Sequence, residues 1–268
     1  MRGTLVALLV ATPSLLLPGF ATDAPEMVAL LAILAGALTF MEYNTHFPSF
    51  VEFRDAPPLN RMRFVALFAM VFSLTVVVKH AYEPSTLTAV FAGIGTIVGN
   101  WIDFPYSPVR LVILMLPADI SPATVDSVRM AAGVSYMIAM VTVFMFLFTD
   151  RVLGWPTSNG AFNVWINLPL FDPTTGGDVV YRLQRDGRIN VILGVLLPFI
   201  IPAFVKLMSD LVDPITMEDP KMLIWTMSAW AFLPSSMIMR GVAMLRIAEL
   251  IEEKRRRAYA NAEALQTA

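Results

Sequence analysis

The chain has 268 residues, of which 57% are hydrophobic and only 15% are charged, and its formal net charge is −2. A soluble domain is about 25% charged, so this composition leaves too few polar residues to cover a water-exposed surface and predicts an integral membrane protein in a lipid bilayer. The absence of cysteine excludes disulfides, thiolate nucleophiles and cysteine-ligated zinc, and the small net charge gives no basis for a nucleic-acid partner.

A helix that crosses a membrane needs about 20 mostly apolar residues. The sequence offers such runs at 4–20, 27–41, 64–78, 86–101, 130–148, 191–205 and 222–239. An eighth run at 110–117 has about half of that length, so whether it crosses stays open. We therefore expect an all-α, polytopic transmembrane bundle of seven or eight spans. The alternative for the first run is a cleaved signal peptide, because Gly19 and Ala21 form a small-x-small site.

Lysine and arginine near the ends of the spans indicate the cytoplasmic side. Both termini are expected to be cytoplasmic, in a bacterial inner membrane, and the last span is expected to continue as a basic amphipathic helix over 240–258. Assignments made from the two ends agree only if 110–117 completes an eighth crossing. Otherwise that run lies flat or re-enters, and one end is misassigned. The residues proposed to anchor the topology and to contact anionic lipid are Lys254, Arg255, Arg256 and Arg257.

Two connecting segments stand out. Residues 41–64 combine aromatic, proline and charged residues and are interpreted as an interfacial cytoplasmic linker, with Phe47, Phe50 and Phe53 as a candidate docking surface. Residues 149–190 are rich in turn-forming residues and are expected to form a cytoplasmic loop. Within it, 162–168 and 179–183 have the β-branched and aromatic character of short extended segments.

Ionisable residues near the membrane are the candidate polar, proton or ligand site, because such groups are costly there. Glu42 and His46 are four residues apart and would share one helix face, as a proton relay or as a hydrogen-bonded pair that ends the helix. Asp103 and Arg110 flank a turn beside the half-length run, and short membrane segments often line transporter sites. Lys79 is the fifth member of this set. His46 and His80 fall on opposite faces of the expected topology, so no metal site is predicted.

Small residues four apart let helix backbones approach closely. Gly95 and Gly99 form one such pair, and Ala32 and Gly36 form a weaker one. Both are predicted helix-packing positions.

No catalytic template is present, since the chain lacks GxxxxGK[ST] and GxSxG. We therefore predict no catalytic residues and no cofactor. The first functional hypothesis is a non-catalytic accessory, assembly or stabilising component of a larger membrane complex, with other membrane subunits or a second copy as partner. The alternative is a small-solute or ion transporter, which would gather Glu42, His46, Lys79, Asp103 and Arg110 around one cavity.

Overall fold

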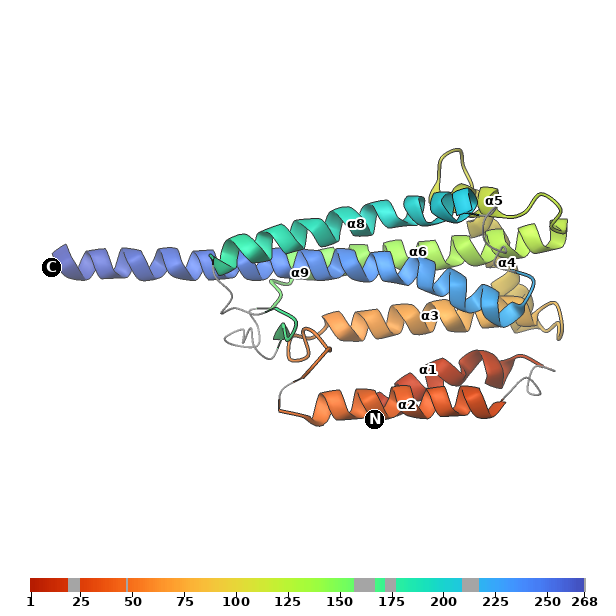
Figure 1. The fold of residues 1–268 in the computed structure, drawn as a ribbon, viewed down its shortest axis with the longest axis horizontal. Coiled ribbons are helices and arrows are strands. Elements are labelled where there is room, and N and C mark those ends of the chain that lie inside the picture. The colour runs from red at the N-terminus through yellow and green to blue at the C-terminus, as the bar shows by residue number, and fades with distance from the viewer. Residues whose placement is uncertain (19–24, 47, 157–166, 172–176, 209–216, 268) are drawn as a thin grey trace.

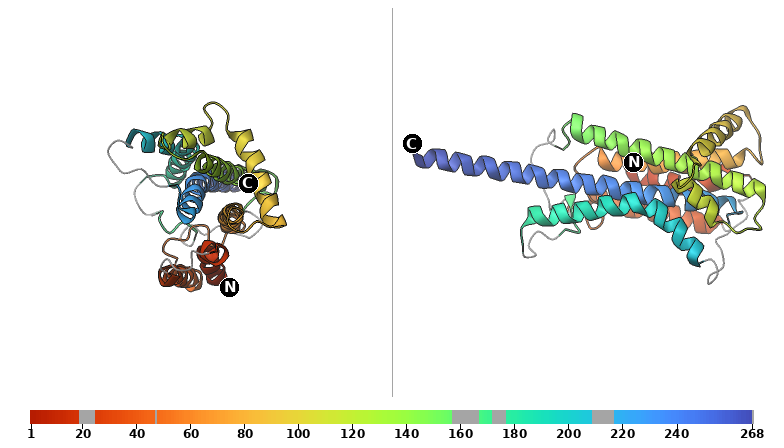
Figure 2. Two further views of the ribbon diagram at one scale, coloured as in Figure 1. Left: turned by 90° about the vertical axis from the view of Figure 1, so that its right-hand side faces the viewer. Right: turned by 90° about the horizontal axis from the view of Figure 1, so that it is seen from above.

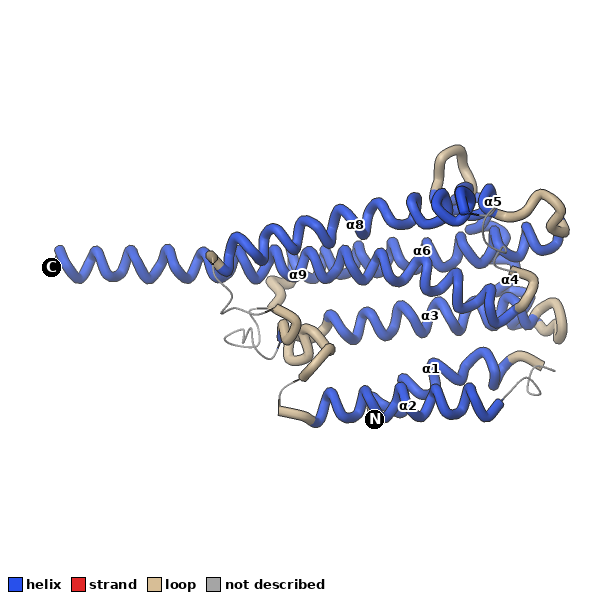
Figure 3. The backbone as a smooth tube through the Cα atoms, in the orientation of Figure 1, coloured by secondary structure: helices blue, strands red, loops and turns tan. Residues whose placement is uncertain are grey.

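In the part of the chain that the computed structural model describes, the protein is a bundle of helices without a strand (Figures 1 and 3). The described residues are 1–18, 25–46, 48–156, 167–171, 177–208 and 217–267. The helices are α1 (Arg2–Leu16), α2 (Pro25–Asn44), α3 (Leu59–Lys79), α4 (Thr86–Ile102), α5 (Pro108–Met115), α6 (Pro122–Val152), α8 (Val179–Met208) and α9 (Pro220–Thr267).

Five of these helices, α2, α3, α6, α8 and α9, are long and apolar enough to cross a membrane, and α1 and α4 are shorter apolar helices. They confirm the predicted helical membrane bundle. The long helices lie side by side in Figure 1, with the described loops gathered at the two ends of the bundle (Figure 3). The α1–α2 hairpin is peripheral, because α2 packs on α1 and α1 in turn packs on α3.

The run at 110–117 does not cross the bundle. Helix α5 has eight residues, a length of about 12 Å at 1.5 Å per residue, whereas a bilayer core is about 30 Å thick. Helices α4 and α5 both lie at the end of the bundle where α3 ends and α6 begins (Figures 1 and 2). Residues 103–107 therefore lie at the same end as residues 80–85. The predicted crossing at 86–101 is corrected as well, because α4 is a shorter apolar helix that begins and ends at this end of the bundle. Neither run contributes a crossing, so the eight-crossing arrangement is wrong on this point.

Two ends can now be defined. The basic end carries residues 48–58, the start of α8 and the point where α9 leaves the bundle. The opposite end carries residues 80–85, 103–107 and 116–121 (Figure 1). The described lysines and arginines near the basic end include Arg2, Arg54, Arg61, Arg63, Arg151, Arg182, Arg185, Arg188, Arg240, Arg246, Lys254, Arg255, Arg256 and Arg257.

Each end has its own cluster of buried apolar side chains. The cluster toward the opposite end joins α3, α5, α6 and α9 through residues such as Leu74, Val112 and Ile224. The cluster at the basic end adds loop residues, Phe53 and Trp155 among them, to α6, α8 and α9. A large apolar side chain in a loop is stabilised by about 1.5–3 kcal/mol when it is removed from water. Helices that pack in lipid do not gain this energy from one another, because the lipid tails are equally apolar.

Glycines mark the closest helix crossings. Gly99 of α4 faces Gly133 of α6, where a Cβ built on Gly133 would lie 2.6 Å from the Cα of Gly99. Gly95 is in looser contact, with a built Cβ 3.6 Å from Met130. In the hairpin, a Cβ on Gly36 would lie 2.9 Å from the carbonyl oxygen of Gly3.

Helix α8 crosses α9 in the same way. A Cβ built on Gly241 would lie 2.5 Å from the carbonyl oxygen of Gly187. These two glycines are far apart in sequence, so no spacing pattern within one helix predicts the pair. Ala32, the remaining predicted packing residue, is buried in the hairpin.

The loop expected over 149–190 is shorter than predicted, because α6 continues to Val152 and α8 begins at Val179. Residues 179–183 are helical and not extended. Asp178 accepts a hydrogen bond from the N–H of Val180 (3.2 Å), and Val180 and Leu183 are buried in the basic-end cluster. Capping and burial thus override the β-propensity of this stretch. The other expected extended segment, 162–168, lies outside the described residues except for Asn167 and Leu168.

Candidate functional site

The five residues predicted to form a polar site are divided between the two ends of the bundle. Glu42 and His46 lie where α2 ends, at the basic end, whereas Lys79, Asp103 and Arg110 lie at the opposite end. They therefore do not line one common cavity. Each group has a different local role.

Glu42 anchors the linker that follows α2. Its buried carboxylate accepts hydrogen bonds from the backbone N–H groups of Ser49 (3.0 Å), Phe50 (3.2 Å) and Val51 (3.2 Å). Arg54 reinforces the same turn by donating to the carbonyl of Glu42 at 3.0 Å. A carboxylate that satisfies several N–H groups acts as a cap. The side chain of His46 is exposed, so the predicted pairing of Glu42 with His46 is replaced by this capped turn.

The candidate docking surface is corrected at Phe53. Phe53 is fully buried and packs against Trp155, with the ring centroids 5.9 Å apart, while Phe146 meets Trp155 edge-on at 5.4 Å. Phe50 is exposed, and Phe47 lies outside the described residues. The alternating aromatic residues of the linker do not reveal which ring is buried, because Phe53 is buried by contact with Trp155, a residue far away in the sequence.

Trp155 joins the two loops of the basic end. Its indole N–H donates to the carbonyls of Ala56 (3.2 Å) and Pro57 (3.1 Å). Asn167 adds two contacts with the linker, accepting from the N–H of Asp55 (2.9 Å) and of Phe53 (2.6 Å). The described parts of both loops are thus held in fixed positions by hydrogen bonds.

A buried ion pair fastens the linker to α9. Arg240 donates to both carboxylate oxygens of Glu52, from Nε at 2.5 Å and from Nη2 at 2.8 Å. Arg63 of α3 lies in the same region and donates to the carbonyl of Ser236 at 2.9 Å. A bidentate pair of an arginine and a carboxylate fixes the relative orientation of the two side chains as well as stabilising their contact. These residues escaped the sequence analysis because the partners are 188 positions apart.

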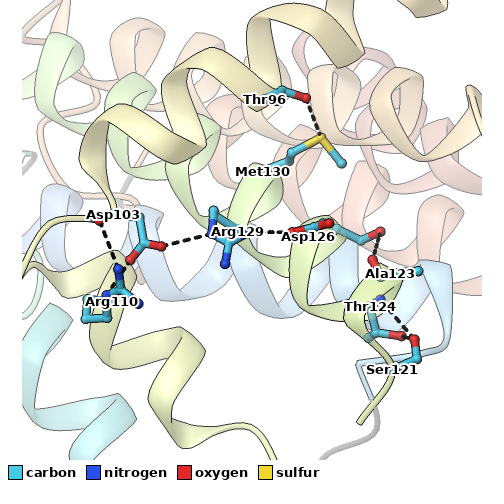
Figure 4. A network of polar contacts seen from close by, with 10 residues as sticks. Thr96, Asp103, Arg110, Ser121, Ala123, Thr124, Asp126, Arg129 and Met130 are labelled. Carbon is cyan, nitrogen blue, oxygen red and sulfur yellow. Dashed lines mark hydrogen bonds and ion pairs between the residues drawn. The ribbon is translucent and has the colours of Figure 1, made fainter.

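At the opposite end, Asp103 is held between two arginines (Figure 4). The Nε atom of Arg110 lies 2.8 Å from one carboxylate oxygen, and the Nε atom of Arg129 lies 2.9 Å from the other. The predicted proximity of Asp103 and Arg110 is present, and Arg129 of α6 is an additional partner that also pairs with Asp126. The cluster ties α4, α5 and α6 together.

Lys79 pairs with Glu83, four residues later, at 3.0 Å. A cavity of about 260 Å³ lies nearby and is lined by His80, Thr124, Ser127 and Glu218 together with apolar side chains. The Nδ1 atom of His80 is 3.0 Å from the hydroxyl of Thr88. None of Glu42, His46, Asp103 and Arg110 lines this cavity.

Helix α9 continues beyond the bundle at the basic end (Figure 1). Lys254, Arg255, Arg256 and Arg257 all lie on this exposed part. Arg255 reaches back to Asp178 at 2.8 Å, and its hydrogen bond lowers the pKa of the Asp178 carboxyl below its usual value. A lowered carboxyl pKa means that the contact is complete at neutral pH and is lost as the pH falls through the lowered pKa.

Comparison with known proteins leaves the geometry as the only guide to function. No family model matches the chain, no curated protein matches it, and no solved structure matches it. Among the described residues, no three histidine, aspartate or glutamate side chains come together as a metal site would require.

Proposed function

We propose that the protein is a non-catalytic component of a larger membrane complex, which it helps to assemble or to stabilise through its basic end. The observation that carries the proposal is the exposed part of α9. The side chains over 254–263 are exposed, and beyond the contact of Arg255 with Asp178 the helix has left the bundle. A bare helix of this length is only marginally stable in water, so a partner that packs along it would stabilise it.

The polar chemistry of the chain supports the same proposal. The buried carboxylates of Glu42, Glu52 and Asp103 are engaged by backbone N–H groups or by arginines that join separate helices and loops. Carboxylates that are engaged by partners from separate elements hold those elements together. Transport has less support, because its five candidate residues are divided between the two ends of the bundle.

The surface that we propose for the partner comprises the projecting helix and Phe50. Phe50 is 53% exposed on a turn that Glu42 and Arg54 hold in place. An aromatic side chain on a backbone that is already held in place loses less conformational entropy on binding than one on a flexible segment, and aromatic residues are favoured in interfaces. We further propose that the basic end is cytoplasmic, since lysine and arginine accumulate on that side of bacterial membranes.

The experiment is a mass measurement of the assembly extracted from native membranes without delipidation. We expect the wild-type chain of 29.6 kDa in a larger assembly, and we expect deletion of 252–268 to release it as a monomer. A matched variant replaces Lys254, Arg255, Arg256 and Arg257 by glutamine, which keeps the helix and removes its charge. Thermal unfolding in detergent checks that both variants retain the bundle.

A wild-type chain extracted only as a monomer would overturn the proposal. So would a deletion variant that keeps the full mass of the assembly. Loss of mass in the glutamine variant would assign the contact to charge, and its retention would assign it to the packing of the helix.

A further inference from the structure

A groove opens between α6 and α8 at the basic end, with α9 as its floor. Figure 2 shows α9 (blue) between α6 (green) and α8 (teal). The groove contains a cavity of about 310 Å³, lined by residues of all three helices. Both α6 and α8 pack extensively on α9, but toward the opposite end α5 packs against α6 and α8 and fills the space between them. The cavity itself is lined by residues in the basic half of the three helices.

A buried carboxylate lies in this groove without a hydrogen bond on one oxygen. The side chain of Asp150 is 4% exposed, and its Oδ1 accepts no hydrogen bond. The nearest cations are Arg246, with Nε 3.7 Å from Oδ1, and Arg151, with Nε 3.6 Å from Oδ2. Both distances exceed hydrogen-bond length. A buried acceptor in this state is stabilised by a ligand that donates a hydrogen bond to it.

The rim of the groove carries excess positive charge. Arg246 is already engaged, because it donates to Glu249 at 3.1 Å and to the carbonyl of Trp155 at 3.2 Å. Arg151 and Arg188 also line the cavity and are exposed, and Arg188 forms no ion pair with a described residue. Against these two cations stands the single carboxylate of Asp150. The groove thus has a residual charge of +1, which a phosphodiester would neutralise.

The groove runs directly into the apolar surface of the bundle. On α6, Phe144, Leu147 and Phe148 are exposed within six residues of Asp150, and on α8 Ile189 and Ile192 are exposed just after Arg188. Charged and apolar exposed residues thus meet at one level, as they do where a helix passes from headgroups into acyl chains. Basic pockets between helices at this level bind phospholipid headgroups.

We propose that this groove binds one anionic phospholipid whose headgroup carries hydroxyl donors, of the phosphatidylglycerol type. The phosphodiester accepts hydrogen bonds from Arg151 and Arg188, a headgroup hydroxyl donates to Oδ1 of Asp150, and the acyl chains follow the exposed apolar residues of α6 and α8. This inference is independent of any partner protein.

The test is native mass spectrometry of the full chain in detergent, titrated separately with phosphatidylglycerol, phosphatidylethanolamine and phosphatidylcholine. We expect one tightly bound phosphatidylglycerol. Arg188→Gln should weaken it about tenfold, the usual effect of losing one charge-assisted hydrogen bond, and Arg151→Gln is the second variant. Arg61→Gln is the matched control, because Arg61 is an exposed arginine near the same end, outside the groove, and should leave the affinity unchanged.

Equal affinity of Arg188→Gln, Arg151→Gln and Arg61→Gln would overturn the proposal. If phosphatidylcholine bound as tightly as phosphatidylglycerol, or phosphatidylethanolamine bound more tightly, the proposed preference for an anionic headgroup would be wrong. A competition arm with inorganic phosphate distinguishes a lipid site from a site for a soluble anion. Displacement of the lipid by phosphate at comparable concentration would contradict a lipid site.

Discussion

At the scale of single residues, several side chains that the sequence suggests as functional have structural roles. Glu42 caps the turn after α2, Asp103 joins three helices, and Phe53 packs into a core made with Trp155. In each case the residue is close to partners that the linear sequence does not place beside it. A polar residue near a membrane can thus hold structural elements together as readily as it can form a functional site, and only its partners distinguish the two roles.

The capping role of Glu42 predicts a local effect. Replacing Glu42 by glutamine removes the charge that strengthens its hydrogen bonds to three backbone N–H groups, so the turn should open more often. We expect amide hydrogen exchange at Ser49, Phe50 and Val51 to accelerate about tenfold, equivalent to ~1.4 kcal/mol. Glu26→Gln is the control, since Glu26 is exposed at the start of the same helix. Unchanged exchange in E42Q would show that Glu42 does not hold the turn.

At the scale of helices, close approach is set by glycines that meet across a crossing. Gly99 and Gly133 bring α4 onto α6, and Gly187 and Gly241 bring α8 onto α9. Lipid tails are as apolar as leucine, so packing contacts hold helices together in a bilayer more than hydrophobic burial does. The position of α4, which lies at one end of the bundle, depends on this contact and on the Asp103 cluster.

The α4–α6 crossing predicts opposite outcomes for two glycine-to-alanine changes. In Gly133→Ala the new methyl group would lie 2.6 Å from the Cα of Gly99, so we expect a loss of about 1–3 kcal/mol in the free energy of unfolding. In Gly93→Ala the methyl group meets nothing within 4 Å, and the better helix propensity of alanine should leave stability equal or slightly higher. Thermal unfolding in one detergent measures both. Equal stability of the two variants would contradict the crossing.

At the scale of the whole molecule, the two ends differ in charge and in architecture. The described loops at the basic end are fastened to each other and to α9, whereas the opposite end holds two short helices, α4 and α5, that do not reach across (Figures 1 and 2). This arrangement reconciles the positive-inside assignments made from the two termini. With α4 and α5 kept at one end, residues 48–58, the start of α8 and the C-terminal helix share a side without an eighth crossing.

The topology is open to a direct test, because the chain contains no cysteine. Single cysteines at Tyr106 and at Phe50, which are 86% and 53% exposed, can be labelled in intact cells with a membrane-impermeant maleimide. We expect Tyr106→Cys to be labelled from outside and Phe50→Cys to be labelled only after the cells are opened. Tyr82→Cys, at the same end as Tyr106, is the control for labelling from outside. Labelling of Tyr106→Cys and Phe50→Cys on the same side would restore the eight-crossing arrangement.

The sequence by itself determined that the chain lies in a lipid bilayer and that its fold is a bundle of helices. Runs of apolar residues as long as those of α3, α6 and α8 must be helical in a bilayer, because no water is present to satisfy the backbone. It also located the basic helix at the C-terminus and the proximity of Asp103 and Arg110, since helical spacing and a short turn are local properties. The sequence also identified Gly99 as a helix-packing position, because the small-xxx-small pattern is a local spacing within one helix.

Only the tertiary structure decided which groups meet. Arg129 joins Asp103, Arg240 joins Glu52, and Trp155 turns Phe53 inward, and each of these contacts spans a loop or a helix length that no periodicity encodes. The same holds for α4 and α5, whose place at one end depends on a glycine crossing and an ion cluster. Helical periodicity is a property of neighbouring residues, whereas the choice among helix partners depends on shape and charge brought together by the whole chain.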